Sequence, residues 1–323
     1  MTTTPLTTRT TDRPATSRGV KALRAVAIAA CVPYLSLKLT WIFGGRIGIP
    51  EDSTLLDHRA TMLIANTATV LMDACVVVLA LLLTRPWGLR VRSWLLAVPM
   101  WAATGLLAPI MAGFPLQILV RLLGGSVRTE AANDPFLHEW VFSVVYGGFI
   151  LQGLALGALF VLYARRRWGH IWQGRVWDLD AGPKAPAVAA AVCAVLPVTT
   201  HTLWATGSAT GLSSAAADGR ASDFYALEVL YALFPVVAVA GALLLAFRPA
   251  PGLALRVPLA LVWLGSAATA CWGGWLLIGS LAATDMADRP TALMLLTYAG
   301  AMITGLLVLL TGVRHTAARR ASV

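Results

Sequence analysis

Long apolar stretches alternate with short polar ones along the whole chain. Each stretch has about 20 residues, the length that an α-helix needs to cross a hydrocarbon core of roughly 30 Å. Runs of this length are too long for buried strands or ordinary core helices. The pattern predicts an all-α membrane protein with about eight transmembrane helices. We place these helices near residues 25–44, 60–83, 93–113, 140–163, 186–205, 224–247, 257–282 and 291–313.

The first four predicted helices recur as the last four. Residues 38–44 read Lys-Leu-Thr-Trp-Ile-Phe-Gly and are matched by residues 201–207, which read His-Thr-Leu-Trp-Ala-Thr-Gly. The Arg-Pro pair at 85–86 recurs at 248–249 with the same offset. Because each unit holds an even number of helices, we expect two tandem parallel four-helix repeats, related by a pseudo-twofold axis along the membrane normal. Chance similarity between helices rich in Ala and Leu is the alternative.

This duplication divides the chain into five parts. The first membrane repeat occupies residues 25–163 and the second occupies 186–313, and a cytoplasmic linker, 164–185, joins them. A cytoplasmic tail, 1–24, precedes the first repeat; its start is rich in Thr, Arg and Pro and is expected to be disordered. A second cytoplasmic tail, 314–323, follows the last helix.

One segment breaks the symmetry between the two repeats. Residues 114–125 are apolar but too short to span the membrane, and they end at a Gly-Gly pair. The second repeat has no counterpart, since only residues 283–290 join its last two helices. A segment of this kind lies in the outer interface or dips back into the bundle. It is either a lid over a site or a plain interfacial loop.

Composition and charge agree with this architecture and add an orientation. Hydrophobic residues make up 58% of the chain and charged residues only 12%, which excludes a water-soluble globular protein. Most of the 25 basic residues fall in the two tails and in the loops after helices two, four and six, so both termini are predicted to be cytoplasmic. Topology thereby accounts for the net charge of +10, and we expect no nucleic-acid partner.

Residue usage indicates the source of the membrane. Arginine greatly outnumbers lysine and alanine is abundant, which is typical of a GC-rich bacterial genome, so we expect a bacterial plasma membrane. Arg165, Arg166 and Arg167 lie at the predicted cytoplasmic interface near several tryptophans. This cluster is first a topology signal and secondarily a contact for anionic lipids of the bilayer.

Polar residues inside the predicted helices are the strongest indication of a site. A charge at the centre of a membrane helix costs roughly 2.5 to 3.5 kcal/mol, so such residues are kept for function or are paired. We predict a polar cavity that opens to the outer face between the repeats. The alternative is that Lys38 pairs with Asp73 and His201 with Glu228, as buried pairs that only fix helix register. The residues of the predicted cavity are Lys38, Asn66, Asp73, His201 and Glu228.

We expect no cofactor and no bound metal. The 4 cysteines lie inside predicted helices without metal-ligand spacing. His201 is the only histidine well within a predicted helix, which disfavours haem held by facing histidines. Carboxylates and histidines in the outer loops are a possible metal site, but they lack any zinc-binding spacing. These outer residues are Asp57, His58, Asp134, His138 and Glu139.

The first helix and the loop after it resemble a known group of proteins. The sequence of residues 33–41, the glycine pair at 44–45 and the Gly-Ile-Pro at 48–50 are similar to those of uncharacterised multi-span membrane proteins of actinobacteria. The resemblance implies a membrane location and brings no assigned activity with it.

Two kinds of activity, and one role without activity, fit these features. A transporter or permease would bind its substrate between the duplicated halves and rock one half against the other. A membrane-embedded enzyme acting on a lipid-like substrate would need a water-accessible acid and base, for which His201 and Glu228 are the best pair. An accessory or regulatory membrane protein would need neither. We favour the transporter-like interpretation.

Overall fold

Eight long apolar helices form the protein in its computed structural model, which describes residues 17–51, 53, 59–126, 137–178, 184–250, 252–282 and 289–321. All eight are long and apolar enough to cross a membrane, which confirms the prediction of a multi-pass helical membrane protein. Within the described ranges the single β-bridge joins Arg175 to Ala254. The eight helices are α1 (Arg18–Ile42), α2 (Arg59–Thr84), α3 (Ser93–Leu122), α4 (Glu139–Trp168), α5 (Lys184–Ala205), α7 (Ser222–Phe247), α8 (Arg256–Ala282) and α9 (Ala292–Ala321).

Several helices extend further than the apolar stretches indicate. Residues 18–24, which we assigned to the N-terminal tail, form the first turns of α1, and the side chain of Ser17 caps them by accepting from the N–H of Val20. Residues 164–168 and 314–321, assigned to the linker and the C-terminal tail, continue α4 and α9. A hydropathy pattern ends where charge begins, whereas a helix continues because long basic side chains reach water from its last turns.

Residues 114–122, which we expected as a separate interfacial segment, continue α3 instead. Pro115 lies inside the helix and removes one backbone donor without ending it. With 30 residues, α3 is roughly 45 Å long and exceeds a hydrocarbon core of roughly 30 Å. The helix is therefore tilted in the membrane or extends beyond it at one end.

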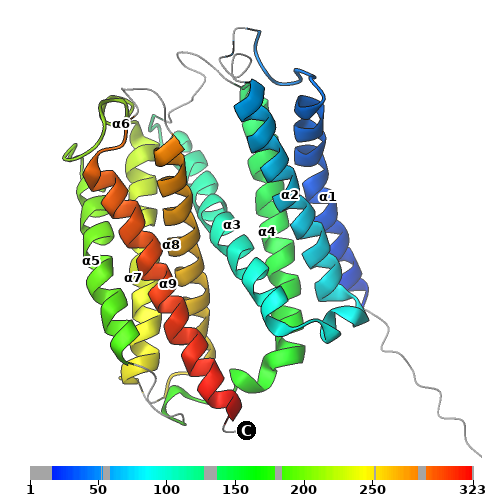
Figure 1. Ribbon diagram of the computed structural model, residues 1–323, viewed down its shortest axis with the longest axis vertical. Helices are drawn as coiled ribbons and strands as arrows, with labels where there is room; N and C mark the ends of the chain where they lie inside the picture. Colours follow the sequence, from blue (N-terminus) through cyan, green and yellow to red (C-terminus); the bar gives the residue numbers. More distant parts are fainter. Residues whose placement is uncertain are drawn as a thin grey trace, which may run out of the picture.

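Short elements connect the long helices at both ends of the bundle. Three of them are short 3₁₀ helices at the end of the bundle where the described chain begins and ends, and the fourth is a short α-helix at the opposite end (Figure 1). These elements are η2 (Pro86–Arg90), η3 (Gly169–Ile171), η4 (Val176–Asp178) and α6 (Ser214–Asp218).

The outside of the bundle is apolar, and small residues lie at several of the helix crossings inside it. Val192, Ile278 and Leu281 are each 67% exposed, as side chains that face lipid would be. At helix crossings, a Cβ on Gly265 would lie 2.5 Å from the backbone nitrogen of Ala238, so α8 and α7 approach to backbone contact. Small residues suit such crossings, because lipid chains are as apolar as Leu and only close packing favours helix association.

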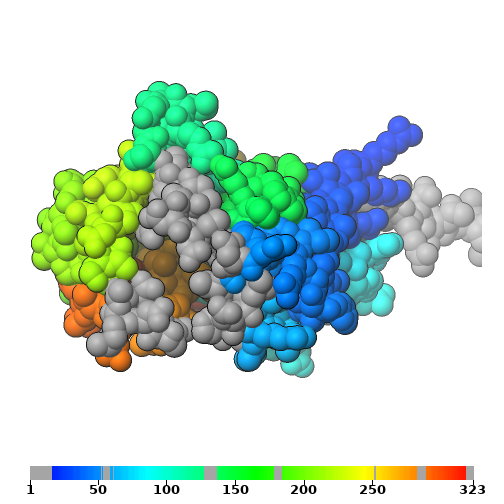
Figure 2. All heavy atoms as spheres, turned by 90° about the horizontal axis from the view of Figure 1, so that it is seen from above, coloured from blue at the N-terminus to red at the C-terminus, as the bar shows by residue number. Residues whose placement is uncertain are grey.

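The long helices form two groups, and α3 leans from one group to the other (Figure 1). Helices α1, α2 and α4 pack together as the first group, and α5, α7, α8 and α9 form the second group. Although α3 follows α2 in the chain, it touches α2 sparsely and packs chiefly against α8. In the view from above, the two groups lie on opposite sides and the end of α3 stands at the rim between them (Figure 2).

The contact between α3 and α8 is close and specific. A Cβ on Gly105 would lie 2.2 Å from the carbonyl oxygen of Ala267, so only glycine permits this approach. Next to it, Trp101 Nε1 donates to Ser266 Oγ at 2.9 Å. The third helix of the chain is thus attached to the second group by backbone packing and by a side-chain hydrogen bond.

Helices α1 and α5 end in turns of the same geometry. Trp41 Nε1 of α1 donates to the carbonyl of Ile47 at 2.7 Å, and Trp204 Nε1 of α5 donates to the carbonyl of Thr210 at 2.9 Å. A glycine with positive φ follows each tryptophan by three residues, with φ of 88° and 99°. Each indole thereby satisfies a carbonyl of the turn that follows its helix.

The packing of α3 on α8 predicts a selective effect of substitution at Gly105. We expect Gly105→Ala to lower the free energy of unfolding by about 1 to 3 kcal/mol, because the added methyl group forces the two backbones apart. Gly157→Ala in α4 is the matched control, since nothing lies within 4 Å of its added Cβ. Denaturant unfolding in detergent measures both variants, and equal stability of the two would contradict the proposed α3–α8 contact.

Candidate functional site

Lys38 of α1 and Asn66 of α2 form the first of three polar pairs between helices. Lys38 Nζ donates to Asn66 Oδ1 at 2.9 Å. The same ammonium group lies 5.2 Å from the ring centroid of Tyr34 and 4.7 Å from that of Trp41. The negative faces of both rings attract the charge. Lys38 therefore has an amide and two aromatic rings around it, in place of the carboxylate of Asp73.

Asp73 of α2 and Gln152 of α4 form the second pair. Gln152 Nε2 donates to Asp73 Oδ1 at 3.0 Å, and the two residues are 4% and 1% exposed. Their other oxygens, Asp73 Oδ2 and Gln152 Oε1, are buried without a hydrogen-bond partner. Leaving a buried acceptor unmatched costs about 1 to 3 kcal/mol, and more for a charged group. This pair therefore presents two acceptors that remain to be satisfied.

His201 of α5 and Glu228 of α7 form the third pair. His201 Nδ1 lies 2.5 Å from Glu228 Oε2, and both side chains are buried. When Glu228 is ionised, its oxygen accepts and the imidazole Nδ1–H donates. The imidazole also makes edge-to-face contacts with Trp204 at 5.3 Å and Tyr231 at 5.6 Å between ring centroids. This pair joins α5 to α7, and aromatic side chains surround the imidazole.

A cavity of about 560 Å³ lies between the two helix groups. Its walls come from α2 and α4 on one side, from α7 and α8 on the other, and from α3, with Tyr34 of α1 added. Of the five predicted site residues, only Asp73 lines this cavity, next to its partner Gln152. The cavity is mainly apolar and aromatic with one carboxylate, whereas we expected polar residues from both repeats to converge on it.

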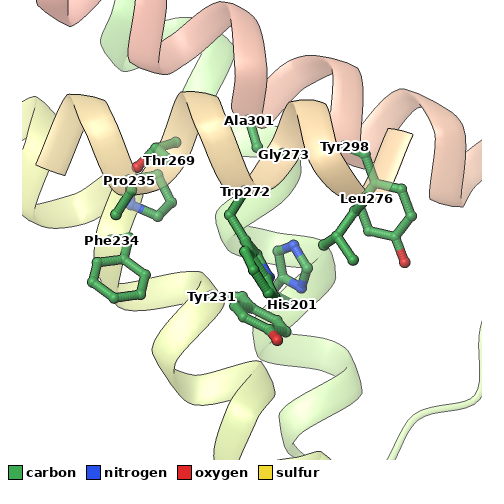
Figure 3. Close-up of a pocket in the computed structure, with 11 residues that line it drawn as sticks. His201, Tyr231, Phe234, Pro235, Thr269, Trp272, Gly273, Leu276, Tyr298 and Ala301 are labelled. Carbon is green, nitrogen blue, oxygen red and sulfur yellow. The ribbon is translucent and has the colours of Figure 1, made fainter. Parts of the chain in front are cut away.

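His201 lies beside a second and much smaller space, which Figure 3 shows. Its volume of about 20 Å³ is close to the space that one water molecule needs. Trp272 and Tyr231 lie next to the imidazole, and Tyr298 of α9 lies on another side (Figure 3). The space leaves no room for a lipid-like substrate at His201.

Two glutamines were missed, because the search of the sequence concentrated on ionisable groups and added only Asn66 among the uncharged polar residues. Gln152 is one of them, and Gln117 of α3 is another; both line the large cavity. Gln117 Nε2 donates to Asp223 Oδ2 at 3.0 Å, and Asp223 at the start of α7 is buried. A glutamine in an apolar stretch is nearly as rare as a charge and could have been found by the same reasoning. The aromatic lining carries no comparable signal.

The structure describes only some of the outer-loop residues that were considered as metal ligands. Asp57, His58 and Asp134 lie outside the described residues. Glu139, at the start of α4, forms an exposed ion pair with Arg121 at 3.1 Å. Among the residues that the structure describes, no group of three or more His, Cys, Asp or Glu side chains is placed to hold a metal ion.

The three arginines at the end of α4 differ in the contacts that they make. Arg167 donates to the carbonyl of Val91 at 2.5 Å and to that of Gly88 at 3.3 Å, so it fixes the turn between α2 and α3. Arg165 and Arg166 are exposed. One of the three arginines is thus used inside the protein.

The His201–Glu228 pair predicts a strongly non-additive effect on stability. Glu228→Leu should lower the free energy of unfolding by about 3 to 5 kcal/mol, because it leaves the imidazole buried without its partner. The double variant His201→Leu with Glu228→Leu should recover a large part of this loss, since no polar group is then left unmatched. Denaturant unfolding of both single variants and the double variant tests this, and additive effects would show that the two side chains are not coupled.

Comparison of the chain with protein-family models, with curated proteins and with solved structures finds no match.

Proposed function

We propose that this multi-pass membrane protein is transporter-like and binds its substrate in the cavity between the two helix groups. The cavity itself carries this proposal. At about 560 Å³ it falls within the roughly 300 to 1,000 Å³ of small-molecule sites. Asp73 lies about 14 residues from the start of α2, roughly 21 Å along the helix axis and so near the middle of a membrane. Binding near the midplane, between two bodies that move against each other, is how many secondary transporters work.

The proposal includes a tandem duplication of the membrane region. The matched turns after α1 and α5 support it, and so do the glycines that follow them. A Cβ on Gly48 would lie 2.5 Å from the side chain of Val141 at the start of α4. A Cβ on Gly211 would lie 2.4 Å from the side chain of Leu293 at the start of α9. Each glycine lets the loop after the first helix of its repeat pack on the fourth helix.

Within this duplication, the cavity corresponds to an opening of the first repeat. In the second repeat, α7 and α8 are in close contact, since a Cβ on Gly241 would lie 2.8 Å from the backbone nitrogen of Val262. Their counterparts in the first repeat, α2 and α3, touch sparsely, and the cavity lies between them. We infer that α3 moves with the second group against α1, α2 and α4, so that the cavity opens and closes along this boundary.

The orientation and the membrane are part of the same proposal. Both ends of the described chain lie at one end of the bundle (Figure 1). Basic residues gather at this end, among them Arg85, Arg90, Arg165 and Arg175. Because positively charged loops are retained in the cytoplasm, we assign this end to the cytoplasmic side of a bacterial plasma membrane. Arg165 and Arg166 are then placed to contact anionic lipids.

An enzyme that uses His201 and Glu228 as acid and base is less well supported. The space beside His201 holds about one water molecule. A lipid-like substrate would need the surrounding aromatic residues to move away first. The larger cavity needs no such rearrangement.

Aqueous access to the cavity tests the transporter-like function. In a variant whose native cysteines are replaced by alanine, we expect Leu106→Cys and Leu227→Cys, both in the cavity wall, to react with a charged methanethiosulfonate reagent. Val192→Cys should stay unreactive, because a thiol that faces lipid cannot ionise although it is 67% exposed. Labelling is followed by mass spectrometry on membrane vesicles. Two unreactive cavity cysteines would remove the proposed function.

Reporter fusions test the orientation. Green fluorescent protein fused after Trp177 or after the last residue should fluoresce, because both sites are assigned to the cytoplasm. Alkaline phosphatase fused after Gly219, beyond α6, should be active outside the cytoplasm. The reverse pattern would show that the assigned orientation is wrong.

A further inference from the structure

We propose that the cavity between the helix groups takes an amphipathic organic cation, such as a protonated or quaternary amine, and that Asp73 supplies the charge that matches it. This inference rests on the proposed function, since it assumes that the cavity is the binding site. It adds the chemical class of the substrate.

The charge of the cavity wall is the first reason. Among the described residues that line the cavity, Asp73 is the single side chain that can carry a full charge near neutral pH, and no Lys, Arg or His is present. Lys38 of α1 is bonded to Asn66 and does not line the cavity. Asn66 lies seven residues from Asp73 on α2, roughly 10 Å along the helix axis. The wall therefore favours a positively charged ligand over a neutral or negative one.

The unmatched acceptors are the second and independent reason. Asp73 Oδ2 and Gln152 Oε1 are buried oxygens without a hydrogen-bond partner, and both side chains line the cavity. Gln152 Nε2 is the donor of this pair, and it is already hydrogen-bonded to Asp73 Oδ1. When Asp73 is ionised, a rotation of its side chain toward the cavity would let a ligand that donates hydrogen bonds or carries positive charge satisfy Oδ2, whereas an anion would be repelled.

The aromatic wall is the third reason. Cations bind favourably to the faces of aromatic rings, with about 2 kcal/mol or more when water is excluded. The rings around the cavity come from both helix groups and from α3, so they surround a ligand on several sides. The apolar remainder of the wall suits the hydrocarbon part of an amphipathic molecule. The aromatic lining residues are Tyr34, Phe114, Tyr146, Phe149, Tyr231, Trp272 and Trp275.

When no ligand is bound, the negative charge of the Asp73 carboxylate must be compensated in another way. Its neighbours offer no cation: Cys31 and Tyr34 of α1 interact with it electrostatically, Gln152 of α4 donates to it, and the described α3 residues of the cavity wall are uncharged. A carboxylate without a partner in a region without bulk water takes up a proton. Binding of the cation then releases this proton, and the net charge of the site is the same before and after. The cavity would thus exchange one proton for one organic cation.

Binding of two ions of the same shape and opposite charge tests the proposal. The probes are tetraphenylphosphonium and tetraphenylborate, measured by equilibrium dialysis on the full chain in lipid nanodiscs, with binding to empty discs subtracted. We expect the cation to bind, to release about one proton per ion, and to bind more weakly as the pH falls. Tetraphenylborate should not bind. Equal binding of the two ions, or cation binding without proton release, would overturn the proposal.

Variants assign the binding to Asp73. Asp73→Asn should weaken tetraphenylphosphonium binding by about thirtyfold or more, as expected when a buried charge loses its partner. Asp218→Asn, the same change on the exposed α6, should bind as the parent does. If Asp73→Asn does not fold, Trp275→Leu provides a second test, with an expected loss of about two- to tenfold. Unchanged binding in Asp73→Asn, or in Trp275→Leu if that variant must be used, would overturn the assignment.

Labelling in the presence of the ion separates the two proposals. Protection of Leu227→Cys by tetraphenylphosphonium would support both the cavity as a site and the class of its ligand. Reactive cavity cysteines together with no cation binding would reject the ligand class and leave the transporter-like function standing. Unreactive cysteines and no binding would reject both.

Discussion

A membrane offers no water to a buried polar group, and this constraint arranges the interior of the protein. Backbone N–H and C=O groups form their hydrogen bonds within the helices, so the groups that still need partners are the polar side chains. Lys38, Asp73 and His201 each form a hydrogen bond with a side chain of a neighbouring helix. These hydrogen bonds tie α1 to α2, α2 to α4 and α5 to α7. The polar pairs therefore hold each helix group together from within, while small residues set the spacing of its helices.

Asp73 satisfies this constraint less completely than the other two. Glu228 has the imidazole of His201 against one oxygen, and Lys38 has an amide and two rings. Asp73 has one amide, and its second oxygen is buried without a hydrogen bond. A buried carboxylate in this state lowers the stability of the fold. Its position on the large cavity is what the proposed binding role uses.

The sequence predicts the helices well and their packing poorly. Apolar runs indicate all eight membrane helices, because the hydrocarbon thickness fixes their length. The pairing of His201 with Glu228 was one of two alternatives that the sequence left open. The partner of Lys38 could not be deduced, since Asn66 and Asp73 lie on the same face of α2 and both are within reach of a long side chain. The lean of α3 toward α8 depends on the close approach at Gly105 and on the hydrogen bond from Trp101 to Ser266. Glycine is too common in this chain to reveal the first, and no sequence pattern pairs the two residues of the second.

The short turn η2 acquires a particular importance from the placement of α3. The chain crosses there from the first group to the helix that is attached to the second. Tyr163 donates to the carbonyl of Gly88 at 2.9 Å, and Arg167 donates to the carbonyl of Val91, so α4 holds this crossing from both ends. In the proposed motion, α3 would turn about this fixed point rather than slide past it. The eight long helices of the described chain would then move as three against five, although the proposed duplication divides them into four and four.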